Sequence, residues 1–301
     1  MRTSHKEMRR KINTEVSKIT DEELFSSAAF AAYLTDIAEA VTKRYKRRLR
    51  VETIYDTSEN AMIACTNNRN ILINTGNYIS QSMPYRKLKA ESILGLVGHE
   101  VGHMLFTNFR ISETYFSELS YGRLYPQMEL SEEEQESFTE VTDYFKAGTE
   151  AQKQAILKAA KLLLNILEDA YIEARICDRY TGRFATGIHL NNIRFTEMMP
   201  SVTEQLTNGC YRFSVFCNLL NQYCRSGDIN NRDEYTGELL DLFYDVLPLV
   251  DDAIYDEDMK RRCYAVNRVL LMVWAYIKEI AEKFHNIIIT NNEETIWSKQ
   301  Y

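Results

Sequence analysis

Proline, glycine and histidine are all scarce in this chain of 301 residues, which holds four prolines, eleven glycines and five histidines. Because proline and glycine are the residues that interrupt helices, their scarcity favours long and continuous helices. Long apolar runs are missing as well, since no stretch approaches the roughly 20 apolar residues of a membrane-spanning helix. Residues 1–6 are polar and lack the apolar segment of a secretory signal. We therefore expect no membrane partner.

Paired cysteines and an excess of positive charge are also missing. The six cysteines include no CxxC pair, and a chain of this length does not need disulfides to stabilise its core. We therefore expect a protein of the reducing cytoplasm. The net charge of -7 makes nucleic acid an unfavourable partner. Apolar residues make up 45% of the chain and charged residues 26%, which is typical of a globular protein rather than a disordered one.

The strongest chemical motif in the chain is an HExxH segment formed by His99, Glu100 and His103. Two histidines four residues apart stack on one face of a helix, so both rings can bind one metal ion. Glu100 can then act on the bound water as a general base. Apart from the motif's own residues, residues 96–105 are all uncharged, as a buried helix that carries a metal site requires. The motif therefore predicts a zinc site.

Zinc in such a site needs a third protein ligand, with the fourth position left to water. Among the other histidines, His5 lies at the start of the chain and His285 lies far along a late helix, which leaves His189 as the remaining credible imidazole. The residues from Phe106 onward do not contain the GxxH continuation of the metzincins. We therefore expect a glutamate from a downstream helix, which is the gluzincin arrangement.

The expected carboxylate lies in a long helix predicted over residues 150–178. Glu168, Asp169 and Glu173 interrupt an apolar segment of it, and a buried carboxylate needs a cation or a paired group. Asp169 and Glu173 are four residues apart and share a face. Gluzincin ligands are commonly followed one turn later by an acid that orients a histidine, and that spacing favours Asp169 followed by Glu173. Glu168 and Glu173 are nevertheless the leading candidates and Asp169 is the third, and spacing alone does not choose among them.

Together, the two segments resemble those of bacterial and phage metallopeptidase-like proteins in which a von Willebrand factor A domain follows the peptidase-like part. The resemblance covers residues 50–180. It rests on the HExxH segment and on residues 165–173, which are similar to the family pattern N-x-x-E-D-x-R-x-E except for Tyr171 at the arginine position. It implies a gluzincin-type zinc peptidase in which Glu168 is the third ligand. No DxSxS motif of a von Willebrand A domain follows residue 180.

The predicted fold is α+β and predominantly helical. Short β-rich segments separated by turn residues predict a small antiparallel sheet before the HExxH helix. Its strands are expected at residues 51–55, 61–65 and 71–74. The HExxH helix itself is expected over residues 85–106.

These elements predict two domains. Residues 1–180 are expected to form a zincin-like metallopeptidase core, and residues 181–301 a helical C-terminal subdomain. Within this plan, residues 110–150 are expected to be a lid or linker that includes a helix starting near Glu132, and residues 180–200 a glycine-containing loop that carries His189.

The expected activity is hydrolysis of protein or peptide substrates. Zn²⁺ held by His99, His103 and Glu168 would lower the pKa of a water molecule, and Glu100 would remove its proton and pass it to the leaving amine. Asp169 and Glu173 would act as supporting groups or alternative ligands. Candidate oxyanion donors are His189, Tyr180 and Arg183. The substrate is expected to extend along the sheet beside residues 71–73.

A second hypothesis is a catalytically silent protein. In this interpretation, zinc stabilises a scaffold or adaptor that acts with a partner ATPase or a von Willebrand A protein. The presence of Glu100 favours the enzyme, because a general base contributes nothing to zinc coordination.

Overall fold

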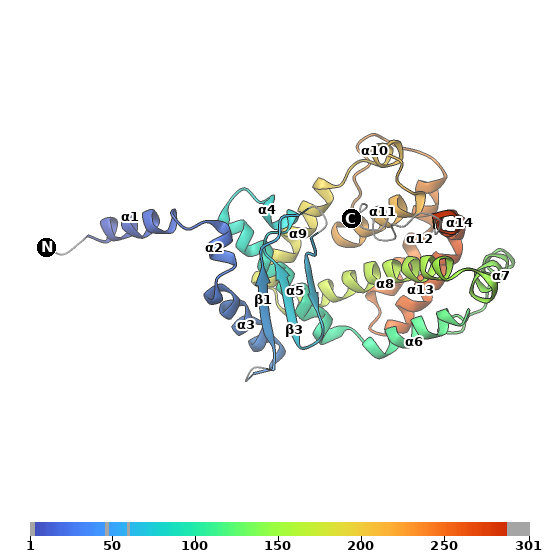
Figure 1. Ribbon diagram of the computed structural model, residues 1–301, viewed down its shortest axis with the longest axis horizontal. Helices are drawn as coiled ribbons and strands as arrows, with labels where there is room; N and C mark the ends of the chain where they lie inside the picture. The colour runs from blue at the N-terminus through green and yellow to red at the C-terminus, as the bar shows by residue number, and fades with distance from the viewer. Residues whose placement is uncertain (1–3, 46–47, 59–60, 288–301) are drawn as a thin grey trace. The chain divides into compact units, whose positions relative to one another are not determined.

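The computed structural model describes residues 4–45, 48–58 and 61–287 (Figure 1). The chain divides into two compact units, one made of residues 1–105 and 176–191 and the other of residues 106–175 and 192–301. The expected domains, residues 1–180 and 181–301, stay a prediction. No helix in the described part of the chain combines the length and the apolar character needed to span a membrane.

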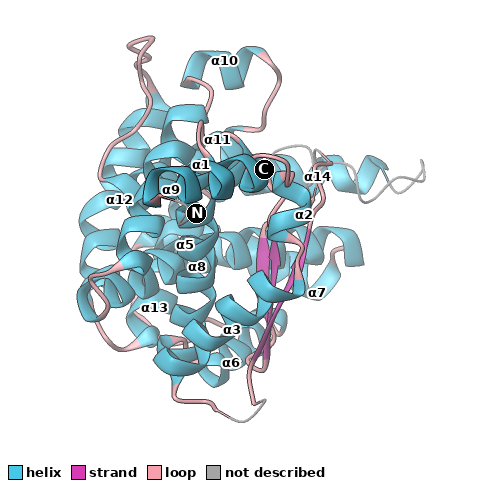
Figure 2. Cartoon of the chain, turned by 90° about the vertical axis from the view of Figure 1, so that its left-hand side faces the viewer, coloured by secondary structure: helices cyan, strands magenta, loops and turns pink. Residues whose placement is uncertain are grey.

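The first unit contains a small three-stranded sheet, drawn in magenta in Figure 2. Its strands are β1 (Arg50–Ile54), β2 (Ala64–Thr66) and β3 (Asn70–Asn74), in the order β1-β3-β2. β1 pairs with β3 in parallel and β2 pairs with β3 antiparallel, so the sheet is mixed and the prediction of an antiparallel sheet was wrong. β3 is the central strand and is paired on both sides. A substrate cannot add to its edge, which also overturns the expected position beside residues 71–73.

Helices make up the rest of the first unit. They are α1 (His5–Val16), α2 (Asp21–Phe25), α3 (Ala28–Thr42), α4 (Tyr78–Gln81), nearly all of α5 (Arg86–Phe106) and the first part of α9 (Arg183–Met198). Figure 1 shows α3 running alongside β1, where the Thr35 hydroxyl accepts a hydrogen bond from the Val51 amide at 3.0 Å. α5 begins shortly after Pro84 and runs without a break through the HExxH segment, as its sequence predicts.

α5 and α9 approach each other closely through glycines. A Cβ atom on Gly95 would lie 2.3 Å from the carbonyl carbon of Gly187, and a Cβ on Gly98 would lie 2.9 Å from the ring of Phe184. Asn191 adds a polar contact, because its side-chain amide donates to the Ser92 carbonyl at 3.0 Å. Glycine therefore permits the helix–helix contact that supports the HExxH helix.

The same contact corrects the prediction for residues 180–200. This segment is not a loop, because α9 occupies most of it. Gly182 and Gly187 were interpreted as loop signals, whereas Gly187 lies inside a helix and provides room for α5. His189 lies on α9 with its side chain exposed.

The second unit is helical. Its helices are α6 (Phe109–Ser120), α7 (Glu132–Ala147), α8 (Glu150–Arg179), α10 (Val202–Thr207), α11 (Arg212–Ser226), α12 (Glu238–Tyr255), α13 (Met259–Met272) and α14 (Trp274–Ile287). One cluster of buried apolar side chains draws residues from all of them. The predicted helix at Glu132 is confirmed, and it starts with a capping box between Ser131 and Glu134. The rest of the expected lid contains a second helix, α6, whose Tyr115 and Leu119 belong to the core.

Candidate metal centre

The two histidines of the HExxH motif face each other on α5. Their Nε2 atoms are 3.2 Å apart, and the ring planes make an angle of 81°. Two nitrogens bound to one tetrahedral zinc at about 2.0–2.1 Å each would be separated by about 3.3–3.4 Å. Both side chains are half-buried, so a further ligand such as water could reach a metal ion bound by the two rings. The geometry of the pair therefore fits zinc.

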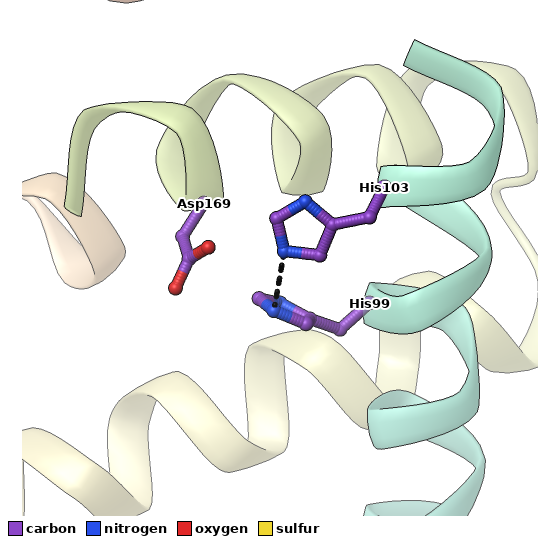
Figure 3. A group of neighbouring side chains, drawn as sticks. All are labelled: His99, His103 and Asp169. Carbon is purple, nitrogen blue, oxygen red and sulfur yellow. Dashed lines mark hydrogen bonds between the residues drawn. The ribbon is translucent and has the colours of Figure 1, made fainter. Parts of the chain in front are cut away.

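Asp169 provides the third ligand atom of the group. Among the described residues, His99, His103 and Asp169 each offer one ligand atom, and these atoms all lie within 4.8 Å of one another. Figure 3 shows the Asp169 carboxylate next to the two imidazoles, with a dashed line between the His99 and His103 nitrogens. Two imidazoles and one carboxylate form a donor set that suits zinc. Asp169 was one of the alternative ligands in the sequence analysis.

Glu168 is not part of this group, although the resemblance made it the expected ligand. Its Oε2 accepts a hydrogen bond from Nε of Arg262 at 2.6 Å, and the Arg262 side chain is fully buried. The guanidinium carbon of Arg262 also lies 3.8 Å from the centre of the Tyr171 ring. Adjacent residues on a helix point about 100° apart, so Glu168 and Asp169 face different surroundings. Glu168 forms a buried ion pair within the second unit.

A second arginine contacts the Asp169 carboxylate. Nη2 of Arg225 lies 3.2 Å from Oδ2 of Asp169, and its Nη1 lies 3.2 Å from Oε1 of Glu173. The other oxygen of Glu173 accepts a hydrogen bond from the Asn192 amide at 2.7 Å. Glu173 is buried, and this network provides the paired groups that a buried carboxylate needs. Arg225 therefore restrains Asp169 and Glu173 together on one face of α8.

Glu100 lies on α5 between the histidines and is buried, with 5% of its surface exposed. Burial raises the pKa of the Cys65 thiol, and the negative charge of Glu100 raises it further. Cys65 lies on β2. β2 pairs with β3 alone within the described residues, so its other side is an edge of the sheet.

The three candidate oxyanion donors lie in ordinary structural environments in the first unit. His189 is exposed on α9. Arg183 is exposed and donates to the Tyr33 hydroxyl at 2.8 Å, and the Tyr180 hydroxyl donates to the Val41 carbonyl at 3.4 Å. None of these three belongs to the candidate ligand group.

Sequence reasoning missed Arg225, Arg262 and Asn192, which contact the acids of α8. Arg225 is 56 residues from Asp169 along the chain, and Arg262 is 94 residues from Glu168. No local pattern marks either arginine. The one available signal was the acids themselves, because carboxylates in an apolar helix imply cationic partners elsewhere in the chain.

We found no match to this chain among family models, curated proteins or solved structures.

Proposed function

We propose that this protein is a zinc-dependent peptidase that uses Glu100 as its general base. The observation that supports the proposal most strongly is the convergence of two imidazole nitrogens and one carboxylate oxygen within 4.8 Å. The general base of an HExxH motif adjoins the first of these histidines in the chain. A helical HExxH segment next to a small mixed sheet also supports a zincin-like core in the first unit.

In this proposal, His99, His103 and Asp169 hold the zinc ion. When bound, zinc supplies a Lewis acid that polarises the scissile carbonyl and makes water more acidic. Arg225 holds Asp169 in position through its bond to Oδ2. The ligand set departs from the one that the family resemblance implies, because Asp169 takes the place of Glu168.

Glu100 moves the proton. Its carboxylate accepts a proton from the attacking water and then donates it to the nitrogen of the leaving amine. Glu100 is buried, which limits the access of bulk water to its carboxylate.

The outer edge of β2 is the place that we propose for the substrate backbone. The Ile63 carbonyl accepts a hydrogen bond from the Asn74 amide, and the Asn67 amide donates one to the Asn70 carbonyl. Because alternate residues of an antiparallel strand bond to the same side, Ala64 and Thr66 direct their N–H and C=O groups to the open edge. An extended peptide can pair with these groups near Glu100.

The test compares the wild type with Glu100→Gln. Both proteins are loaded with zinc, their metal content is measured, and each is incubated with a fluorogenic peptide library and with unfolded casein. We expect about one zinc per chain in both proteins, cleavage by the wild type, and a loss of at least about 100-fold in rate for Glu100→Gln. Glu113→Gln, an exposed glutamate on α6, is the matched control and should cleave like the wild type.

Two results would count against the peptidase. Equal cleavage by the wild type and Glu100→Gln would mean that Glu100 is not the base. A wild type that holds zinc and cleaves nothing in either substrate set would favour the zinc-stabilised scaffold that acts with a partner ATPase or a von Willebrand A protein.

A further inference from the structure

Helix α1 in the first unit has an apolar face that is open to solvent. Every side chain of α1 that the structure describes is exposed, and Met8 and Ile12 are 51% and 55% exposed. These two residues are four apart and therefore share one face of the helix. α1 has 12 residues and starts with a capping box between Ser4 and Glu7. An isolated helix of this length is only marginally stable in water, so a surface that covers its apolar face would stabilise it.

The charge of the chain is divided unevenly between this segment and the rest. Residues 1–20 contain six lysines and arginines and two glutamates, which gives a net charge of +4. Because the whole chain carries -7, residues 21–301 carry -11. Arg9 and Lys11 lie on opposite sides of the apolar face, since successive helix residues are about 100° apart. The partner surface that suits α1 is therefore small-featured and apolar at its centre and acidic around it.

An acidic groove of about 1120 Å³ lies in the same unit, between α3 and β1. The residues of α3 that line it follow the spacing of a single helix face. They are Ala28, Ala31, Ala32, Thr35, Asp36 and Glu39. On the β1 side, Arg50 lies 3.5 Å from Glu52 and offsets its charge. Neither Asp36 nor Glu39 has an ion-pair partner among the residues that the structure describes, so both charges are available to a ligand.

The groove and the exposed helix match in size, shape and charge. The lined face of α3 from Ala28 to Glu39 is about 17 Å long and α1 is about 18 Å long, at 1.5 Å per residue. The three alanines leave room into which larger side chains such as Met8 and Ile12 can pack. The two acids of α3 are complementary to the basic residues beside the apolar face of α1.

We propose that α1 of one copy of this chain docks into the α3–β1 groove of a second copy. Reciprocal exchange of the two helices forms a closed two-fold dimer, in which both apolar faces and both grooves are covered. Within a single chain α1 stays exposed although the groove belongs to the same unit. This inference is independent of the proposed peptidase activity, because none of its residues belongs to the metal centre.

The first experiment measures the oligomeric state of the full-length protein by sedimentation velocity over a wide range of concentrations. We expect a monomer–dimer equilibrium that shifts toward the monomer as salt is added, because the charge pairs are near the surface. Met8→Ser combined with Ile12→Ser removes the apolar face and keeps every charge. This variant should dimerise at least about 10-fold more weakly, because the two side chains lose their burial in the dimer.

The second experiment reverses the charges on each side of the contact. Arg9→Glu with Lys11→Glu gives a helix variant, and Asp36→Lys with Glu39→Lys gives a groove variant. Each variant alone should dimerise at least about 10-fold more weakly than the wild type, because like charges then face each other. An equimolar mixture of the two should recover the dimer, because each helix then meets a groove of opposite charge on the other chain. Docking of α1 within its own chain would not produce this recovery.

Lys158→Glu with Lys161→Glu is the matched control. Both lysines are exposed on α8 in the second unit, and this variant should dimerise like the wild type. Circular dichroism checks that every variant is folded.

The proposal is overturned if the wild type is monomeric at all concentrations, or if the helix and groove variants dimerise as tightly as the wild type. Folded variants that fail to associate when mixed would also overturn it. A monomeric wild type that binds vesicles containing anionic lipid would assign α1 to a membrane surface instead. Loss of cleavage in Glu100→Gln does not affect these measurements, so the two proposals fail separately.

Discussion

Glu168 and Asp169 are neighbours on α8, yet their carboxylates have different partners. Glu168 pairs with the fully buried Arg262, whereas Asp169 belongs to the ligand group of His99 and His103. We propose that the two side chains have different roles, one structural and one in metal binding. Substitutions that remove one charge at a time can separate these roles.

Asp169→Asn and Glu168→Gln should have opposite effects. We expect Asp169→Asn to lower zinc affinity by more than about 100-fold with little change in stability, because it removes a charged ligand. Glu168→Gln should keep zinc affinity but cost about 3 kcal/mol or more of unfolding free energy, because Arg262 would lose its buried partner. Zinc titration and urea denaturation measure the two quantities. A large loss of zinc affinity in Glu168→Gln, with the fold intact, would contradict this assignment.

Arg225 should affect zinc affinity through its contact with Asp169. Removing its guanidinium in Arg225→Met frees the Asp169 carboxylate to rotate, and we expect zinc affinity to fall about 10- to 100-fold. Arg232→Met is a matched control, because Arg232 forms an exposed pair with Glu204 at 3.8 Å. Competition with a zinc-binding dye measures both. Unchanged or tighter zinc binding in Arg225→Met would show that Arg225 does not position the ligand.

The residue types of the site were predictable from the sequence, but the choice among the acids was not. The HExxH spacing brings the two imidazole rings close together, because both histidines lie on one helix. The choice between Glu168 and Asp169 depends on Arg225 and Arg262, which are far away in the chain. A family pattern with arginine at position 171 favoured Glu168, whereas here Arg262 packs against Tyr171 and pairs with Glu168.

At the scale of elements, the contact between α5 and α9 supports the HExxH helix. We expect Gly95→Ala to lower the unfolding free energy by about 1–3 kcal/mol, because the added methyl group would meet the backbone of Gly187 at 2.3 Å. This loss should appear even though alanine is intrinsically about 1 kcal/mol better than glycine in a helix. Urea denaturation measures the change.

Gly182→Ala is the control for this prediction. A Cβ on Gly182 would have no atom within 4 Å, so its substitution should change stability by less than about 1 kcal/mol. Equal effects of the two substitutions would show that the α5–α9 contact is not tightly packed.

The sequence predicted the helices over residues 85–106 and 150–178, while the sheet order and α9 needed information from distant residues. The three strands were expected near their observed positions, but their order depends on which strand pairs with β3, and a parallel β1–β3 pair was not considered. Gly187 indicated a loop because glycine disfavours helices, and its role became visible only with Gly95 opposite it. Non-local packing therefore explains both errors.

At the scale of the whole molecule, zinc should stabilise the folded protein. A ligand that binds only the folded state adds about 2.7 kcal/mol when its free concentration is 100 times its dissociation constant. We therefore expect a chelator to lower the thermal midpoint of the wild type. A variant with both His99→Gln and His103→Gln should melt at the same temperature with and without chelator. Equal sensitivity of this variant to chelator would place the stabilising metal elsewhere.

The most direct test of the account is anomalous diffraction at the zinc absorption edge from crystals of the zinc-loaded protein. We expect one peak about 2.0–2.2 Å from Nε2 of His99, Nε2 of His103 and a carboxylate oxygen of Asp169, with Glu168 still paired to Arg262. A peak coordinated by Glu168 in place of Asp169, or no peak at the two histidines, would contradict the proposed metal centre.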